Sequence, residues 1–369
     1  MSVERHFARS YADAREKFRA ASAARGARQF RYVHPESIGA EGEELSMDFA
    51  MLGRPDADTL LVVLSATHGA EGFCGSGCQV ALMHDDAFMR AIDDSGAEVM
   101  LLHALNPYGF SHLRRVNEDN ADLNRNFVDF ASPLPVNAAY AELHPLLLPA
   151  TWPPELASEA KLGAWLAANG AAAYQAAVSG GQYQFDDGLF FGGRAASWSN
   201  RMLRKALREH AASRSALAWI DFHTGLGPLG HGEKIYAGVN DAAAVARTRD
   251  WWGDDVTTFL DGSSSSSPLT GINGYAAHDE APRAAFAGIA LEYGTYSIPE
   301  MLQALRAEHW LHNHPDAPPT QRDAIKRRLR DVFYVDDDAW KRTVYAQALP
   351  TSLIALKRLA QTSTERQRA

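Results

Sequence analysis

Cysteine, long apolar runs and excess positive charge are all scarce in this chain. Only two of its 369 residues are cysteines, so no disulfide framework is expected to hold the fold together. No apolar run reaches the roughly eighteen residues of a membrane-spanning helix, and residues 1–6 lack the apolar core of a secretory signal. The net charge is −9 without a basic stripe, which argues against nucleic acid as a partner. We therefore expect a cytoplasmic protein that binds neither membranes nor nucleic acids.

Composition and the order of the predicted elements indicate a soluble α/β protein. Apolar residues make up 46% of the chain and charged residues 22%, which is typical of a globular protein with a sizeable core. Although this length has room for two domains, α/β folds often reach it as one, and we place residues 1–369 in a single domain. The alternation predicts a mixed, mostly parallel central sheet between two layers of helices. We expect strands at 29–33, 45–52, 60–65, 98–105, 216–220, 234–237 and 287–291, the first two as an antiparallel edge hairpin, and helices at 2–24, 77–84, 198–212, 242–259, 299–310 and within 321–361.

Residues 132–193 depart from this alternation. Six prolines punctuate alanine-rich helical stretches in this segment. We interpret it as a helical insertion over the active-site face, either as a lid or as plain scaffold, and the sequence leaves both open. The serine run at 263–267 is interpreted as a solvated surface loop, with a position at the edge of the pocket as the alternative.

The most informative motif is Thr-His-Gly-Ala-Glu-Gly at residues 67–72. It follows the apolar run at 60–64, which is typical of a buried parallel strand. His68 and Glu71 stand three positions apart in a glycine-flanked turn, so an imidazole nitrogen and a carboxylate oxygen can be directed at one point. Two histidines and a glutamate are the set that holds catalytic zinc and leaves a fourth position open for water. Alone, this motif is weak evidence for a metal site, and the segments further along the chain decide how it is interpreted.

Three later segments add polar groups. Residues 122–127 put a carboxylate, an amide and a guanidinium into one loop. A second histidine, His223, ends the apolar run at 216–220, and Glu292 ends the short apolar strand at 287–291. Because ligands in open α/β sheets gather at the carboxyl ends of the strands, these groups are predicted to converge there.

With these motifs in order, the chain resembles the zinc carboxypeptidase superfamily, the M14-type metallopeptidases with their aspartoacylase and succinylglutamate desuccinylase branch. More narrowly, it resembles bacterial proteins of this type that are catalogued as a domain of unknown function. The match runs from about residue 60 to residue 294 and is densest at 122–127. The resemblance implies a three-layer zinc-carboxypeptidase-like fold.

The resemblance also implies roles for individual residues. It makes His68, Glu71 and His223 the ligands of one Zn²⁺ ion and Glu292 the general base. Asn124 and Arg125 are implied to bind the terminal carboxylate of the substrate, and Tyr275 is a positional guess for the tyrosine of the classical enzymes. The oxyanion-stabilising arginine is implied to be Arg115, with Arg114 as the competing choice, and Asp122 is implied to stand behind His68.

The chemistry of these residue types agrees with that set. Two neutral imidazoles and one carboxylate leave a bound zinc ion with a net charge near +1 and enough Lewis acidity to lower the pKa of its water toward ~7. Apolar neighbours are expected to raise the pKa of Glu292, which suits a base that accepts a proton from that water. Asp221, two residues before His223, lies on the same face of its strand and is expected to orient that ring or a nearby backbone group.

Two spacings depart from the classical enzymes. The interval between Arg115 and Arg125 is short and closer to the deacylase branch, and the 152 residues between Glu71 and His223 imply a large insertion. Cys74 and Cys78 are expected to pack a helix against the sheet rather than to bind metal, and the histidines at 309, 312 and 314 are expected on the surface.

Together these features predict a zinc metallocarboxypeptidase-like hydrolase that cleaves an amide bond next to a free carboxylate. The expected substrate is a small peptide or an N-acyl amino acid. The alternatives are a deacylase of small N-acyl amino acids and an amidase of peptidoglycan-derived peptides. A non-catalytic metal-binding protein is the alternative from another class, and the presence of Glu292 and Arg115 argues against it. Nothing in the sequence specifies the oligomeric state.

Overall fold

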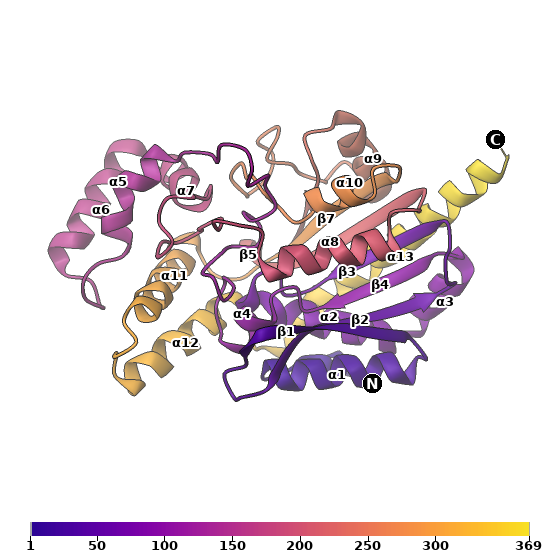
Figure 1. The fold of residues 1–369 in the computed structure, drawn as a ribbon, viewed down its shortest axis with the longest axis horizontal. Coiled ribbons are helices and arrows are strands. Elements are labelled where there is room, and N and C mark those ends of the chain that lie inside the picture. The colour runs from indigo at the N-terminus through magenta and orange to yellow at the C-terminus, as the bar shows by residue number, and fades with distance from the viewer. Residues whose placement is uncertain (1, 369) are drawn as a thin grey trace.

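A computed structural model describes residues 2–368, with side chains to residue 364 (Figure 1). Within residues 2–368 one seven-stranded sheet has the order β1-β2-β4-β3-β5-β7-β6. Neighbouring strands β4, β3, β5 and β7 are parallel, whereas β2 is antiparallel to β1 and β4, and β6 is antiparallel to β7. The predicted mixed, mostly parallel sheet and edge hairpin are therefore confirmed. The strands are β1 (Arg28–Ile38), β2 (Glu44–Gly53), β3 (Thr59–Leu64), β4 (Glu98–His103), β5 (Ala216–Leu229), β6 (Gly232–Tyr236) and β7 (Ala285–Gly294).

Helices cover both faces of the sheet, as the prediction of three layers requires. α2 and α13 pack on one face, with α1 and α3 beside them, and α8 crosses the other face next to α10 (Figure 1). Within the described residues, no helix is both long and apolar enough to cross a lipid bilayer. α9 packs against β7 and α13. The bounds of these helices are α1 (Tyr11–Ala24), α2 (Gly72–His84), α3 (Asp86–Ser95), α8 (Trp198–His210), α9 (Ala242–Trp252), α10 (Tyr275–Glu280) and α13 (Asp338–Arg368).

Local capping explains where the helices differ from expectation. α1 begins at Tyr11 instead of residue 2, because the Ser10 side chain accepts a hydrogen bond from the backbone N–H of Asp13. Ahead of it, Val3–His6 forms only a 3₁₀ turn. α9 ends seven residues early because the chain turns at Gly253, which has a φ of 103°. The short helix α3 was not predicted from the sequence.

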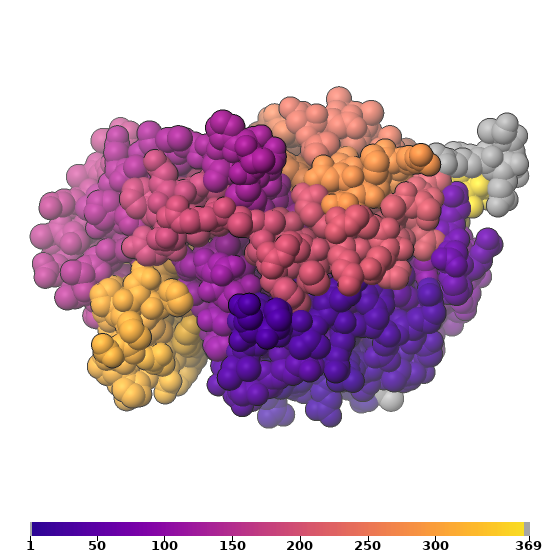
Figure 2. All heavy atoms as spheres, in the orientation of Figure 1, coloured from indigo at the N-terminus to yellow at the C-terminus, as the bar shows by residue number. Residues whose placement is uncertain are grey.

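The predicted helical segment at 132–193 contains α5 (Ala138–Leu147), α6 (Leu156–Asn169) and α7 (Ala171–Ser179). These helices share a second apolar cluster with α11 (Ile298–Asn313) and α12 (Pro319–Phe333), distinct from the cluster around the sheet. In Figure 2 the insertion, in purple, and the gold helices α11 and α12 form the left part of the molecule. The carboxyl ends of the parallel strands are directed toward this part (Figure 1).

Candidate metal centre

The turn after β3, which contains His68 and Glu71, lies beside the part of β5 that contains His223. The chain leaves β3 after Leu64 and forms a short 3₁₀ turn, η2 (Gly69–Glu71), which leads directly into α2. Gly69 packs against α4 (Pro107–Ser111), where an added Cβ would lie 1.9 Å from the carbonyl carbon of Gly109, so the close approach requires glycine. On the neighbouring strands, His223 of β5 pairs with Glu292 of β7.

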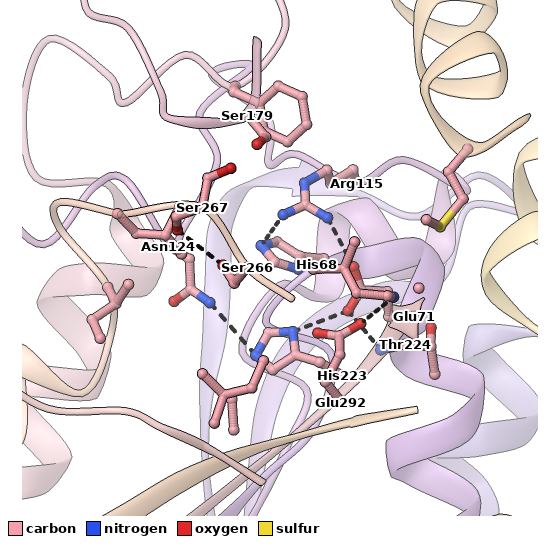
Figure 3. Close-up of a pocket in the computed structure, with 18 of the residues that line it drawn as sticks. His68, Glu71, Arg115, Asn124, Ser179, His223, Thr224, Ser266, Ser267 and Glu292 are labelled. Atoms are coloured by element: carbon pink, nitrogen blue, oxygen red, sulfur yellow. Dashed lines mark hydrogen bonds and ion pairs between the residues drawn. The ribbon is translucent and has the colours of Figure 1, made fainter. Parts of the chain in front are cut away.

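Three buried side chains converge in this region (Figure 3). Nδ1 of His68 lies 2.8 Å from Oε1 of Glu71, and Nδ1 of His223 lies 3.0 Å from Oε2 of the same carboxylate. One ligand atom from each of the three lies within 4.8 Å of the other two. Despite its burial, Nδ1 of His68 makes no well-aligned hydrogen bond with any described residue. A buried nitrogen that makes no aligned hydrogen bond, beside a second imidazole and a carboxylate, fits a single metal ion.

In each of the two histidines, Nε2 of the imidazole contacts a carboxylate. Nε2 of His68 lies 3.1 Å from Oδ1 of Asp122, and Nε2 of His223 lies 2.8 Å from Oδ2 of Asp221. Burial opposes ionisation of Asp122, but Arg115 and His68 bring the pKa of this carboxyl well below its usual range. Such partners fix the tautomer and the ring orientation of metal-binding histidines.

Asp221 is itself held by two polar side chains. It accepts hydrogen bonds from Oγ1 of Thr67 at 2.9 Å and from Nδ2 of Asn273 at 2.7 Å. Sequence reasoning missed Asn273, because a polar residue in an irregular loop has no periodic signal and its partner is 52 residues away. Thr67 belongs to the metal motif, and its position directly before His68 was the available signal.

The two candidate arginines point in different directions. Arg115 donates to Oδ2 of Asp122 and to Oε1 of Glu71, both at 2.9 Å, and lines the cavity that contains the metal cluster. Arg114 is buried away from this cavity and donates to Glu308 at 2.8 Å and to Asn120 at 2.9 Å. Only Arg115 is therefore placed to reach a molecule bound at the cluster.

Glu292 faces the same cavity. Its Oε1 accepts a hydrogen bond from the backbone N–H of Leu226 at 2.9 Å, and its side chain is almost completely buried. Burial, with the added charge of the Glu71 carboxylate, raises the pKa of Glu292 to about 7. A carboxyl group with this pKa exchanges a proton readily near neutral pH.

Asn124 and Arg125 also line the cavity. Oδ1 of Asn124 accepts from the backbone N–H of Asn273 at 3.0 Å. Arg125 donates through its terminal nitrogens to the carbonyl groups of Asn124 and Ser179, and its buried Nε has no hydrogen-bond partner among the described residues. The guanidinium also lies 5.6 Å from the ring centre of Phe190. This buried cation therefore has one N–H donor, on Nε, without a partner among the described residues.

Tyr275 stands apart from these residues. It begins α10, and its half-buried side chain packs against the sheet core. It is not among the residues that line the cavity, although Ile272 and Asn273 in the preceding loop are. Its role in substrate binding stays a prediction.

The cavity has a volume of about 130 Å³, and it is lined in part by two segments whose position relative to the site the sequence left undecided. Gln175, Ser179 and Phe190 of the insertion line it, so this segment contributes directly to the site. Ser266 and Ser267 line it as well, which corrects the interpretation of the serine run as a solvated loop. The run is held inward because Ser265 binds the Glu233 carboxylate.

Cysteines and other histidines lie outside the site. Cys74 and Cys78 are free and buried on α2, as expected of residues that pack a helix against a sheet. His309 is buried, which corrects the expectation of a surface residue, and its Nδ1 lies 3.1 Å from the carbonyl oxygen of Leu305 within α11.

Comparison with solved structures gives matches of low sequence identity. The structure of thrombin activatable fibrinolysis inhibitor matches with a TM-score of 0.50 and 10% identity, over 96% of this chain and 77% of that one. Carboxypeptidase A from Helicoverpa armigera matches with a TM-score of 0.47 and 14% identity, over 87% of this chain and 73% of that one. The succinylglutamate desuccinylase/aspartoacylase of Rhodobacter sphaeroides gives a TM-score of 0.37 and 11% identity, over 78% and 65% of the two chains.

The fold is therefore carboxypeptidase-like, and the buried His-Glu-His group has the composition and spacing to hold a single metal ion. A comparison with curated protein sequences gave no match. A family model does match, over residues 7–347, nearly the whole chain. The chain belongs to the family described as "Protein of unknown function (DUF2817)", and its fold is carboxypeptidase-like.

Proposed function

We propose that this protein is a zinc-dependent hydrolase that cleaves an amide bond next to a free carboxylate. One observation carries the proposal: a single cavity is lined by the three-residue metal cluster, by Glu292, whose carboxyl has a pKa of about 7, and by the buried Arg125, whose Nε–H has no partner among the described residues. Each of these groups has a distinct task in amide hydrolysis, and their combination in one cavity is uncommon for residues that only stabilise a fold.

His68, Glu71 and His223 would hold the zinc ion. Bound there, zinc supplies Lewis acidity, which lowers the pKa of a water ligand toward ~7 and polarises the substrate carbonyl. Asp122 and Asp221 keep the two imidazole rings turned so that both Nδ1 atoms face the Glu71 carboxylate.

Glu292 moves the proton. With a pKa near neutral it accepts a proton from the attacking water and delivers it to the nitrogen of the leaving amine. The backbone N–H of Leu226 holds one oxygen of this carboxylate and leaves the other for the reaction. Arg115 stabilises the negative charge that develops on the carbonyl oxygen, because its hydrogen bonds to Asp122 and Glu71 use only two of its five N–H groups.

Asn124 and Arg125 select the substrate. A carboxylate that approaches Arg125 takes up the free Nε–H and competes with the Ser179 carbonyl for the neighbouring terminal nitrogen, which gives the paired contact that guanidinium groups favour. The amide of Asn124 adds a further donor at the same wall. The scissile amide then lies between this pair and the metal cluster.

The test is a substrate screen with the zinc-loaded protein. Blocked C-terminal dipeptides and N-acyl amino acids are offered side by side, each with a matched compound whose carboxylate is amidated. We expect turnover of free acids from one or both groups and little turnover of the amides. Equal cleavage of acids and amides would contradict the assignment of Arg125, and failure to cleave any compound by a protein with bound zinc would contradict the hydrolase.

A further inference from the structure

Two carbonyl groups of a neighbouring segment hold the turn η2 in place. The backbone N–H of Gly69 donates to the carbonyl oxygen of Arg115 at 3.1 Å, and that of Ala70 donates to the carbonyl oxygen of Arg114 at 2.8 Å. These two donors are the residues between the histidine and the glutamate of the metal motif. A shift of the backbone at residues 114–115 would therefore move two of the three members of the metal cluster.

The side chain of Arg114 anchors this segment to α11. It is almost completely buried, and its Nε donates to Oε1 of Glu308 at 2.8 Å, while its Nη2 donates to Oδ1 of Asn120 at 2.9 Å. A guanidinium that has lost its water needs a charged partner, because a buried cation without one is strongly unfavourable. The position of the Glu308 carboxylate therefore determines where the backbone of Arg114 lies.

Glu308 receives a second cation from α12. Nζ of Lys326 donates to Oε1 of Glu308 at 2.7 Å and to the carbonyl oxygen of Leu113 at 3.3 Å. The helix α12 also packs directly against η2. One buried carboxylate thus joins two helices to the segment that holds the metal turn. We call Arg114, Glu308 and Lys326 the ion cluster.

The ion cluster also connects the metal turn with the cavity wall. Leu305 lines the cavity and lies three residues before Glu308, so the two side chains leave α11 on the same side. Asn120, which accepts from the ion cluster, donates to two carbonyl groups of the insertion. Four residues later the same loop reaches Asn124 and Arg125, the carboxylate-binding pair. A single set of buried charges therefore fixes η2 relative to the other parts of the site.

A second buried set of charges of the same kind provides a comparison. Glu98, the first residue of β4, pairs with the buried Arg214 and with the exposed Arg28. The other hydrogen bonds of Arg214 go to backbone carbonyl groups of residues that do not line the cavity. Because β4 is parallel to β3 and the site is at the carboxyl ends of the parallel strands, Glu98 lies at the opposite edge of the sheet. Only the charges around Glu308 are bonded to the metal turn.

We propose that Glu308 is a positioning residue for the metal centre. Through Arg114 it fixes the backbone that holds η2, and it thereby sets the geometry in which His68 and Glu71 bind the ion. The inference rests on the proposed function, since it takes the metal cluster as a zinc site. It adds a residue outside the cavity to those that determine metal affinity, and it gives a role to the arginine that does not reach the cavity.

The test compares zinc binding by two variants that create the same kind of buried defect. Glu308→Gln removes the charge that anchors Arg114, whereas the control Glu98→Gln removes the charge beside Arg214. Both samples are first shown to be folded by circular dichroism, and zinc affinity is measured by competition with a chelating dye. Glu308→Gln should bind zinc about tenfold more weakly than the wild type, at the lower end of the range for groups that orient metal ligands. Glu98→Gln should keep the wild-type affinity.

A spectroscopic measurement separates geometry from stability. Co²⁺ bound in place of zinc absorbs visible light in bands that depend on the arrangement of its ligands. The spectrum of Glu308→Gln should differ from that of the wild type, and the spectrum of Glu98→Gln should superimpose on it. If Glu308→Gln does not fold, Arg114→Lys takes its place, because it keeps a cation beside Glu308 but loses the planar fork that also bonds Asn120. It should change affinity and spectrum in the same way.

Either of two results would overturn the inference. One is a zinc affinity for the folded Glu308 or Arg114 variant equal to that of Glu98→Gln, and the other is a Co²⁺ spectrum unchanged from the wild type. Both measurements are independent of turnover, so they separate the two proposals. Weaker zinc binding by Glu308→Gln without cleavage of any amide by the wild type leaves the positioning role standing and contradicts the hydrolase. A wild type that binds no zinc overturns both.

Discussion

The imidazole of His68 and the carboxylate of Asp122 meet at 3.1 Å although 54 residues separate them in the chain. Asp122 contacts Nε2 of the ring, so Nδ1 faces Glu71. The same carboxylate accepts a hydrogen bond from Arg115 and one from the backbone N–H of Asn124. One buried side chain thus sets the positions of a metal ligand, the oxyanion-stabilising arginine and the first residue of the carboxylate-binding pair.

Replacement of this carboxylate is expected to weaken metal binding. Asp122→Asn keeps the size of the side chain but removes the charge that orients His68, and zinc affinity should fall by roughly 10–100-fold. Competition with a chelating dye measures the change. The control Asp129→Asn alters an exposed aspartate five residues after Asn124 and should keep wild-type affinity. Equal affinity in both variants would mean that His68 needs no support from Asp122.

The role of Glu292 is tested by separating metal content from turnover. Glu292→Gln retains the hydrogen bond from Leu226 but removes the base, so kcat should fall by at least about 10²-fold. Elemental analysis of the same sample should give the zinc content of the wild type. Near-normal turnover in this variant would show that Glu292 serves only to hold the loop that contains Leu226.

Arg125 decides between a carboxylate-directed hydrolase and a general amidase. Arg125→Lys replaces a planar fork by a point charge, and each charge-assisted hydrogen bond is worth roughly 1.5–3 kcal/mol, so kcat/KM for free-acid substrates should fall at least about tenfold. Substrates with an amidated carboxylate should be poor already and change little. A uniform loss on acids and amides would assign Arg125 to the fold instead of the substrate.

A buried ion cluster outside the site is expected to control stability. Glu308 accepts hydrogen bonds from Arg114 at 2.8 Å and from Lys326 at 2.7 Å, and the arginine and the glutamate are both almost fully buried. Glu308→Gln leaves Arg114 charged without its partner, which should lower the free energy of unfolding by about 3–5 kcal/mol at pH 7. Urea denaturation measures this. Asp186→Asn, which breaks an exposed pair with Arg194, should cost at most about 1 kcal/mol.

The stabilisation by Glu308 should depend on pH with a definite sign. Burial disfavours the ionised form, yet Arg114 and Lys326 hold the pKa of this carboxyl below its ordinary value. A depressed pKa stabilises the folded state above the unfolded pKa of about 4.3 and loses that contribution as the pH falls below it. The stability difference between wild type and Glu308→Gln should therefore be constant above about pH 5 and shrink toward pH 3. A difference that grows on acidification would reverse the assigned sign.

Local patterns in the sequence predicted the sheet and the main residues of the site. The apolar runs at 60–64, 216–220 and 287–291 are followed by His68, His223 and Glu292, and the fold brings these residues together as expected, although β5 continues past His223 to Leu229. Asn273 and the inward position of the serine run were not predictable, because they depend on contacts with Asp221 and Glu233 across the fold. The missed helix α3 did have local signals.

Those signals are at its two ends. Asp85 caps the first turn by accepting a hydrogen bond from the backbone N–H of Ala87, and Gly96 ends the helix with a φ of 62°. An aspartate and a glycine placed around a ten-residue amphipathic stretch are the usual boundaries of a short helix. The sequence did not predict which residues of the insertion line the cavity. Alanine-rich helices carry no local pattern that specifies the elements against which they pack.

The most direct test is a crystal of the zinc-loaded protein measured on both sides of the zinc absorption edge. We expect one anomalous peak from a single zinc ion, with Nδ1 of His68, Nδ1 of His223 and the carboxylate of Glu71 at about 2.0–2.2 Å from it. A peak at another cluster, or none at these three residues in a protein that contains stoichiometric zinc, would contradict it.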